Sequence, residues 1–253
     1  MKAALATAMI LAAGRGERMR PLTDTVPKPL VEVAGKPLVV HQIEALARAG
    51  HRDIAINAAW LARKLADALG DGRAYGVRLH WSIEPEPLET AGGIATARAL
   101  LADGPVLIVS GDIWTAYDYA TLDRHRSGIT LSRGRAAHLV MVPNPPYHPQ
   151  GDFALANEPE YGDAGVRVMP RQARDLPDGP ANLTYGNIGL YDAALFDELP
   201  RGVRLRLAPF LLDWIDRGWV TGEYYSGPWA NVGTPGDLAL LETALANRTP
   251  GRE

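Results

Sequence analysis

The stretch from residue 6 to residue 30 constrains the fold of this chain more than any other part of it. An apolar run from Thr7 to Ala13 breaks at Gly14 and Gly16, which is typical of a buried parallel strand that enters a glycine-rich turn. Because glycine has no Cβ, an anionic group can approach the main chain of such a turn closely, and successive N–H groups suit phosphate oxygens. The stretch therefore predicts a phosphate-binding turn after a buried strand.

Cationic side chains gather beside this turn. Arg15, Arg18, Arg20 and Lys28 follow it closely, and a proline stands on each side of the lysine. From the glycines and charges alone, a surface turn with solvated arginines stays open as an alternative. The two prolines fix the backbone around Lys28 and favour a binding role for it. The third glycine of the dinucleotide fingerprint and the Gly-Lys-Ser/Thr of a P-loop are both missing from the sequence.

Composition limits the classes of partner. The 253 residues are 47% hydrophobic, enough for one large α/β domain with a sizeable core. A net charge of −3 argues against a nucleic-acid or membrane-surface partner. The chain has no cysteine, and its histidines show no metal-ligand spacing. The apolar start from Ala3 to Ala13 mimics a signal peptide, but it leads directly into the glycine turn, so we expect a cytoplasmic protein.

Strands alternate with helices along the first part of the chain, which predicts a parallel sheet covered by helices on both faces. The predicted strands lie at 53–58, 77–83, 105–112, 137–142 and 182–191. The predicted helices lie at 37–49, 61–69, 94–101, 207–217 and 235–247. Residues 156–181 are polar and without a period, so we expect a mobile excursion with little core there, and a disordered tail from Arg248.

Two further segments are expected to meet the glycine turn at one edge of the sheet. A fully apolar strand ends on Asp112, and the loop from Glu84 to Gly93 follows another strand. Loops at the carboxyl ends of parallel strands bind ligands in open α/β sheets, so these segments should converge. A hard cation such as Mg²⁺ would suit Asp112 in this setting. On the residues alone, helix-capping roles for Asp112 and Thr90 stay open.

The string Leu-x-x-Gly-x-Gly-x-Arg-Met-x-Pro-Leu-Thr, followed by Pro-Lys-Pro-Leu, resembles the signature of the sugar-1-phosphate nucleotidyltransferases. Other motifs extend the resemblance over nearly the whole chain: Glu86-Pro-Leu-Glu-Thr, Gly111-Asp-Ile-Trp-Thr, Gly151-Asp-Phe, Leu207-Ala-Pro and Gly233-Thr. Within that family these motifs are most similar to those of uridylyltransferases of cell-wall recycling. The resemblance implies a Rossmann-like, GT-A-like fold with a mixed, mainly parallel sheet. It also implies Mg²⁺-dependent transfer from UTP to N-acetylmuramate 1-phosphate.

The resemblance implies roles for individual residues as well. The implied nucleotide contacts are Ala13, Gly14, Gly16, Glu17, Arg18, Lys28, Glu84 and Thr90. The implied catalytic residues are Arg18, Lys28 and Asp112, and the implied metal ligands are Asp112 and Asn231. The implied sugar-phosphate contacts are Ser110, Asp152 and Asn187. We expect a single domain, 1–253, with a mainly nucleotide-binding half at 1–142, a mainly sugar-phosphate-binding half at 143–235, and a C-terminal helix and tail at 236–253.

The chain departs from the family pattern at three places. Asn231 stands where the family has the Asp of Trp-x-Asp, and an amide oxygen brings no charge to a metal, which puts metal affinity and rate in doubt. Glu89 stands where Gly is usual, and Glu158-Pro159 lacks the lysine of a frequent Glu-Lys-Pro motif. Two alternatives therefore stay open: a guanylyl- or thymidylyltransferase acting on another hexose 1-phosphate, and a catalytically weak sugar-nucleotide-binding protein.

Overall fold

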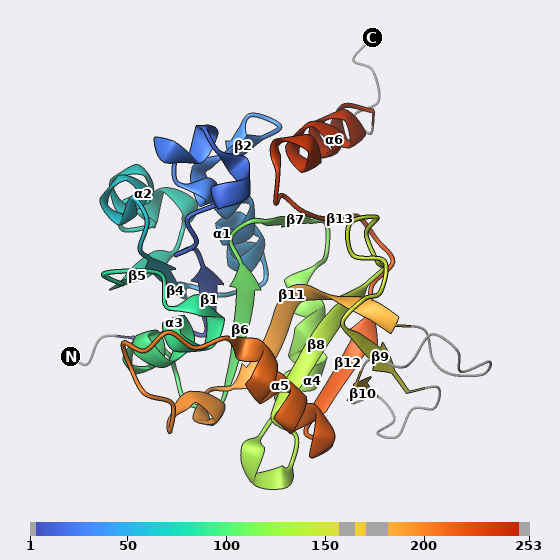
Figure 1. Cartoon of the computed structure of the whole chain (residues 1–253). Helices are drawn as coiled ribbons and strands as arrows, with labels where there is room; N and C mark the ends of the chain where they lie inside the picture. Colours follow the sequence, from blue (N-terminus) through green and yellow to red (C-terminus); the bar gives the residue numbers. More distant parts are fainter. Residues whose placement is uncertain (1–3, 157–164, 171–181, 248–253) are drawn as a thin grey trace.

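The computed structural model describes residues 4–156, 165–170 and 182–247, and a nine-stranded mixed sheet lies at its centre (Figure 1). The strand order is β5-β4-β1-β6-β11-β8-β12-β10-β9. These strands are β1 Ala8–Leu11, β4 Asp53–Ala58, β5 Arg78–Ile83, β6 Pro105–Ser110, β8 Ala137–Val142, β9 Phe153–Leu155, β10 Val166–Pro170, β11 Asn182–Asp192 and β12 Val220–Tyr224. Two short ribbons accompany the sheet: β2 Glu32–Val33 with β3 Lys36–Pro37, and β7 Ile113–Thr115 with β13 Trp229–Asn231.

The two halves of the sheet differ in strand direction. β5, β4, β1 and β6 run parallel to one another, because helices and loops return the chain to the same end of the sheet. β11 runs antiparallel to both of its neighbours, β6 and β8, and β10 runs antiparallel to β12 and β9. β8 and β12 are again parallel. The predicted mixed sheet is confirmed, and most of its parallel pairs lie in the N-terminal half.

Helices cover both faces of the sheet, as the alternation of strands and helices predicts. The helices of the described chain are α1 Leu38–Arg48, α2 Ala62–Leu69, α3 Glu89–Ala97, α4 Asp123–Arg126, α5 Leu207–Asp216 and α6 Pro235–Ala246, of which α6 lies away from the sheet. Met9 in β1 packs in a core cluster with α3 and α5, whereas its neighbour Ile10 packs in a cluster with α1 and α2. Successive residues of a buried strand thus serve two separate hydrophobic layers.

The C-terminal helix α6 packs against the N-terminal part of the chain (Figure 1). Leu241 of α6 shares a small core cluster with Met19, Val33 and Val232. A capping box at Thr234 begins the helix. Among the described helices, none is both long and apolar enough to cross a membrane.

Two sequence predictions need correction. The helix predicted at 94–101 begins earlier, as α3 at Glu89, and its first turns include Gly92, where the backbone of another segment comes too close for any side chain. A Cβ at Gly92 would lie 2.1 Å from the carbonyl oxygen of Val203. The region 156–181, predicted to have little core, contains β10, whose Val168 is fully buried. The rest of that region and the tail from Arg248 lie outside the described residues.

Candidate active site

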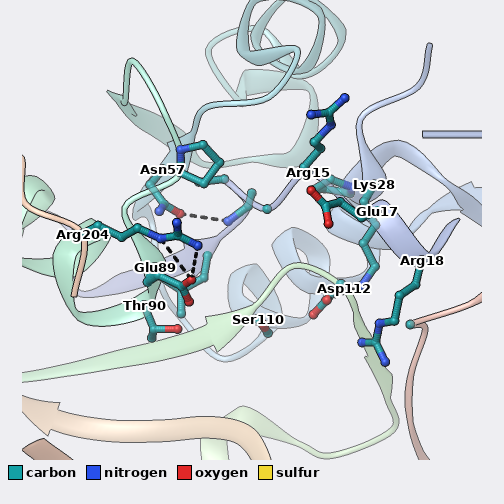
Figure 2. Close-up of a pocket in the computed structure, with 18 residues that line it drawn as sticks. Arg15, Glu17, Arg18, Lys28, Asn57, Glu89, Thr90, Ser110, Asp112 and Arg204 are labelled. Atoms are coloured by element: carbon teal, nitrogen blue, oxygen red, sulfur yellow. Dashed lines mark hydrogen bonds and ion pairs between the residues drawn. The ribbon is translucent and has the colours of Figure 1, made fainter. Parts of the chain in front are cut away.

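A cavity of about 620 Å³ lies at the carboxyl ends of β1 and β6 (Figure 2). We call it the first cavity. Its wall includes eight residues for which the sequence predicts nucleotide, catalytic or metal roles: Ala13, Gly14, Gly16, Glu17, Arg18, Lys28, Thr90 and Asp112. The glycine turn, the loop before α3 and the end of β6 therefore meet in one place, as the sequence predicts.

The glycine turn has a backbone that only glycine fits well. Gly16 has a φ of 69°, in the left-handed region. A Cβ there would lie 3.0 Å from side-chain carbons of both Lys28 and Thr23. The Thr23 hydroxyl donates to the Gly16 carbonyl at 2.8 Å and holds the turn. Gly14 faces open space, so a ligand can reach the backbone there.

Lys28 and Asp112 form an ion pair at the floor of the first cavity. Lys28 Nζ lies 2.5 Å from Asp112 Oδ2, and Lys28 is only 7% exposed. The flanking prolines place Lys28 at the start of a short 3-10 turn, Lys28–Leu30. Asp112 is followed directly by β7, so the helix-capping alternative for this carboxylate is wrong. In this buried ion pair the lysine can bind an incoming anion, and the carboxylate can bind an incoming cation.

The three arginines in and after the glycine turn have different positions. Arg15 lies over the ring of Trp60, 4.5 Å from its centroid, and lines the first cavity. Arg18 also lines the cavity, and its guanidinium lies close to Gly233. Arg20 pairs with Asp24 and does not line the cavity, so the surface-turn alternative holds for this one arginine.

A second cavity of about 460 Å³ adjoins the first, and Leu11, Glu89, Thr90 and Ser110 line both. The predicted sugar-phosphate contacts Ser110, Asp152 and Asn187 all line the second cavity, together with Asn231. The two cavities thus have a common wall that contains the end of β6 and the start of α3. Two ligands bound in them would meet at that wall.

The polar residues of the second cavity are held in place by specific contacts. Asp152 Oδ2 accepts the N–H of Tyr185 at 2.9 Å, and its Oδ1 lies 3.0 Å from His148 Nε2. Asn187 has a φ of 56°, at the point where the pairing of β11 with β8 shifts register. A non-glycine residue in this region costs free energy and is frequent at ligand sites.

Comparison with known proteins assigns the chain to a family. The family model for nucleotidyl transferases matches residues 7–144. This chain belongs to the nucleotidyl transferase family.

Similar proteins of the family span most of the chain. An N-acetylmuramate alpha-1-phosphate uridylyltransferase of Neisseria meningitidis is 46% identical over 90% of this chain and 93% of its own length. A mannose-1-phosphate guanyltransferase of Debaryomyces hansenii is 31% identical over 96% of this chain and 66% of its own length. A solved structure of a putative glucose-1-phosphate thymidylyltransferase from Bacillus anthracis superposes with a TM-score of 0.78 at 20% identity, covering 98% of this chain and 97% of that one. This last likeness supports the nucleotidyltransferase fold.

Glu84, predicted to contact the nucleotide as in the family, lies behind the first cavity. It is 2% exposed and is not part of either cavity wall. Its two carboxylate oxygens accept from Asn57 Nδ2 at 2.7 Å and from the N–H of Leu88 at 3.1 Å. Burial raises the pKa of Glu84, although these hydrogen bonds oppose the shift. Its carboxylate turns inward and holds the loop before α3, so the direct nucleotide contact stays a prediction.

Asn57 is a cavity residue that the sequence analysis missed. Its Oδ1 accepts the N–H of Ala12 at 2.9 Å, and it lines the first cavity. Its place near the carboxyl end of β4 is the signal that could have identified it. Asn57 and Glu84 together connect the glycine turn to the loop before α3.

Glu89, which replaces the usual family glycine, keeps a glycine-like backbone. Its φ is 60°, and its side chain pairs with Arg204, whose Nη2 lies 2.8 Å from Oε1 (Figure 2). Thr90 follows in the first turn of α3, and the N-cap is Leu88, so Thr90 does not cap this helix. The ion pair places a carboxylate of the common wall next to a cation of the first cavity.

Asp112 and Asn231, the predicted metal ligands, lie at one end of a two-stranded ribbon: Asp112 directly precedes β7, and Asn231 is the last residue of β13. β7 pairs with β13, and the N–H of Val232 donates to the carbonyl of Asp112 at 3.0 Å. The Oδ1 of Asn231 is buried and has no hydrogen-bond partner among the described residues. Such an orphaned oxygen beside a carboxylate fits a hard cation, so the residues present suit Mg²⁺.

Tyr147 is a further neighbour of this ribbon that sequence reasoning missed. It lines the second cavity and interacts with the side chain of Asn231. Burial and the charge of Asp237 raise the pKa of the Tyr147 hydroxyl, while the neighbouring Asn231 side chain opposes the rise. The hydroxyl therefore stays neutral at neutral pH.

Another group of potential metal ligands lies outside both cavities: His125, His138 and Glu223. The two imidazoles stack at 3.8 Å with an interplanar angle of 18°. Rings that are nearly parallel cannot both aim a nitrogen lone pair at one ion. Glu223 pairs with Arg124 and accepts from the Tyr117 hydroxyl, and its Oε2 lies 3.1 Å from His125 Nε2. This cluster ties α4 to β8 and β12.

Proposed function

We propose that this protein joins UTP and N-acetylmuramate 1-phosphate to give UDP-N-acetylmuramate and pyrophosphate, in the cytoplasm, in the recycling of peptidoglycan. The observation that carries the proposal is the pair of adjoining cavities, one built on the phosphate-binding turn and both sharing Ser110 and Thr90. The Neisseria meningitidis relative, whose name specifies this reaction, supports the choice of substrates.

The first cavity would hold the nucleoside triphosphate. The backbone N–H groups of the turn around Gly14 suit phosphate oxygens, and Arg18 and Lys28 bring positive charge to the same wall. The second cavity would hold the sugar 1-phosphate, with Asp152 and Asn187 near the sugar. The segments 1–142 and 143–235 would then serve mainly the nucleotide and mainly the sugar phosphate.

The reaction needs little proton transfer. The attacking atom is an oxygen of the sugar phosphate, which is largely ionised at neutral pH because the second pKa of a phosphate monoester is about 6. What the protein must supply is alignment and neutralisation of charge as the pyrophosphate leaves. Lys28 and Arg18 would meet the charge of the triphosphate, while the common wall brings the two reactants together.

Asp112 and Asn231 would hold Mg²⁺, and a bound Mg²⁺ supplies charge neutralisation at the phosphates. Asp112 contributes a carboxylate and Asn231 an uncharged oxygen. In this arrangement Lys28 would turn from Asp112 toward the triphosphate when both ligands are present.

Pyrophosphate release tests the proposed function directly. The full chain is incubated with Mg²⁺ and N-acetylmuramate 1-phosphate and with UTP, GTP, dTTP or ATP in turn. We expect release with UTP to exceed that with the other triphosphates. Faster release with GTP or dTTP and another hexose 1-phosphate would favour the alternative transferases, and binding of UDP-sugar without any release would favour a sugar-nucleotide-binding protein.

Asn231→Asp is expected to raise Mg²⁺-dependent turnover. The added carboxylate brings a charge to a position that now offers only an amide oxygen, and a charge-assisted contact gives roughly a tenfold gain in Mg²⁺ affinity. Turnover at limiting Mg²⁺ and Mg²⁺ binding by calorimetry are measured side by side. A rate that stays unchanged or falls, with no gain in Mg²⁺ affinity, would remove Asn231 from the metal site.

A further inference from the structure

The loop before α5 carries two arginines that line different cavities. Arg204 lines the first cavity and Arg206 lines the second. Leu205, between them, is held by two backbone hydrogen bonds: its N–H donates to the carbonyl of Leu88 at 2.9 Å, and its carbonyl accepts from Gly92 at 3.1 Å. Arg206 has an extended backbone, with φ −76° and ψ 143°, and stands directly before the first residue of α5. These two hydrogen bonds hold the segment that carries both arginines against the start of α3.

Among the described residues that line the second cavity, Arg206 is a cation without a partner. The two acidic residues of this cavity are already engaged, since Glu89 pairs with Arg204 at 2.8 Å and Asp152 contacts His148 at 3.0 Å. Arg206 is exposed and makes no ion pair or hydrogen bond with any residue of the described ranges. An unpaired guanidinium on a cavity wall is a ready partner for an anionic group of a ligand.

The position of Arg206 indicates which anion it meets. The reacting phosphate must lie at the wall that both cavities share, where Ser110 and Thr90 are found. Arg206 lines the second cavity but not the first, and Leu207 and Leu211 line the same cavity. An anion that reaches it therefore belongs to a part of the sugar away from the reacting phosphate.

We propose that Arg206 is a specificity-determining residue that pairs with a carboxylate attached to the sugar of the acceptor. This inference rests on the proposed function, in which the acceptor carries such a carboxylate on its lactyl ether. A planar guanidinium can take a carboxylate through two parallel hydrogen bonds. A neutral amino sugar would leave Arg206 solvated and gain nothing from it, so the residue selects the acidic sugar.

The test compares Arg206→Gln with the wild type on two acceptors that differ only in the lactyl ether, N-acetylmuramate 1-phosphate and N-acetylglucosamine 1-phosphate. Pyrophosphate release is measured with UTP and Mg²⁺. We expect kcat/KM for the acidic acceptor to fall roughly 10- to 100-fold, the range of hydrogen bonds to charged groups, and kcat/KM for the neutral acceptor to stay unchanged. Arg201→Gln, which alters an exposed arginine of the same loop that lines neither cavity, should leave both values unchanged.

Two results would overturn the role of Arg206. An equal loss of kcat/KM with both acceptors would mean that Arg206 pairs with the phosphate they share. Values of kcat/KM that stay at the wild-type level for both acceptors would mean that it contacts neither. Absence of pyrophosphate release by the wild type would instead contradict the proposed function. In that case calorimetry measures the affinity of each sugar phosphate for the wild type and for Arg206→Gln. We expect N-acetylmuramate 1-phosphate to bind more weakly to the variant and N-acetylglucosamine 1-phosphate to bind both proteins equally.

Discussion

Asp112→Asn is expected to lower kcat by roughly 100- to 1,000-fold, the usual cost of removing one preorganised electrostatic contact to a transition state. The substitution keeps the shape of the side chain and removes its charge, so Mg²⁺ loses its only carboxylate among the two proposed ligands. The amide also no longer balances Lys28, which lies within 2.5 Å of this side chain. Steady-state rates over a range of Mg²⁺ concentrations measure the effect.

The control for this variant is Asp103→Asn, which alters an exposed carboxylate that lines neither cavity. Thermal unfolding of both variants separates a loss of rate from a loss of structure. If Asp112→Asn retains the wild-type rate and the wild-type dependence on Mg²⁺, the assignment of the metal site is wrong.

Lys28→Met is expected to lower kcat/KM for UTP by roughly 100- to 1,000-fold, since it removes a cation that would meet the triphosphate in the ground state and in the transition state. Methionine keeps the apolar stem of the buried lysine, which limits the damage to packing. The Asp112 side chain is 29% exposed, so water can solvate the carboxylate that the variant leaves unpaired. Both KM for UTP and kcat are measured.

Lys36→Met is the matched control, because Lys36 pairs with Glu44 outside both cavities. The double variant Lys28→Met/Asp112→Asn should lose less than the sum of the two single losses, since the two residues interact directly. Independent, additive losses would show that the ion pair has no part in the reaction, and an unchanged KM and kcat for Lys28→Met would exclude Lys28 from the nucleotide site.

The first part of the fold could be predicted closely from the sequence. The strand at 53–58 and the strand at 137–142 coincide with β4 and β8, because glycines, prolines and clear apolar runs mark their ends. The start of α3 could not be predicted, since Gly92 lies against the backbone of Val203 and Gly93 against the side chains of Asn57 and Glu84, and the sequence does not reveal these distant neighbours. β10 was missed because its polar, proline-rich surroundings hide a short strand with one buried residue, Val168.

The residues of the site likewise divide into those that the sequence predicts and those that it does not. Residues at strand ends and in the glycine turn, such as Lys28 and Asp112, could be placed together because parallel strands deliver their carboxyl ends to one edge. Arg204 and Tyr147 lie in loops far away in the sequence, and no local pattern distinguishes them from solvated surface residues. The inward turn of Glu84 depends on Asn57, a partner on another strand.

The ribbon of β7 and β13 has a consequence for how this enzyme could change. Asp112 and Asn231 hold their mutual spacing through main-chain bonds, which do not depend on the identity of either side chain. Evolution can therefore exchange a carboxylate for an amide at position 231. Such an exchange changes the negative charge offered to the metal and leaves the spacing of the two ligand positions unchanged. The backbone of the ribbon thus fixes where the two ligand positions lie, whichever side chains occupy them.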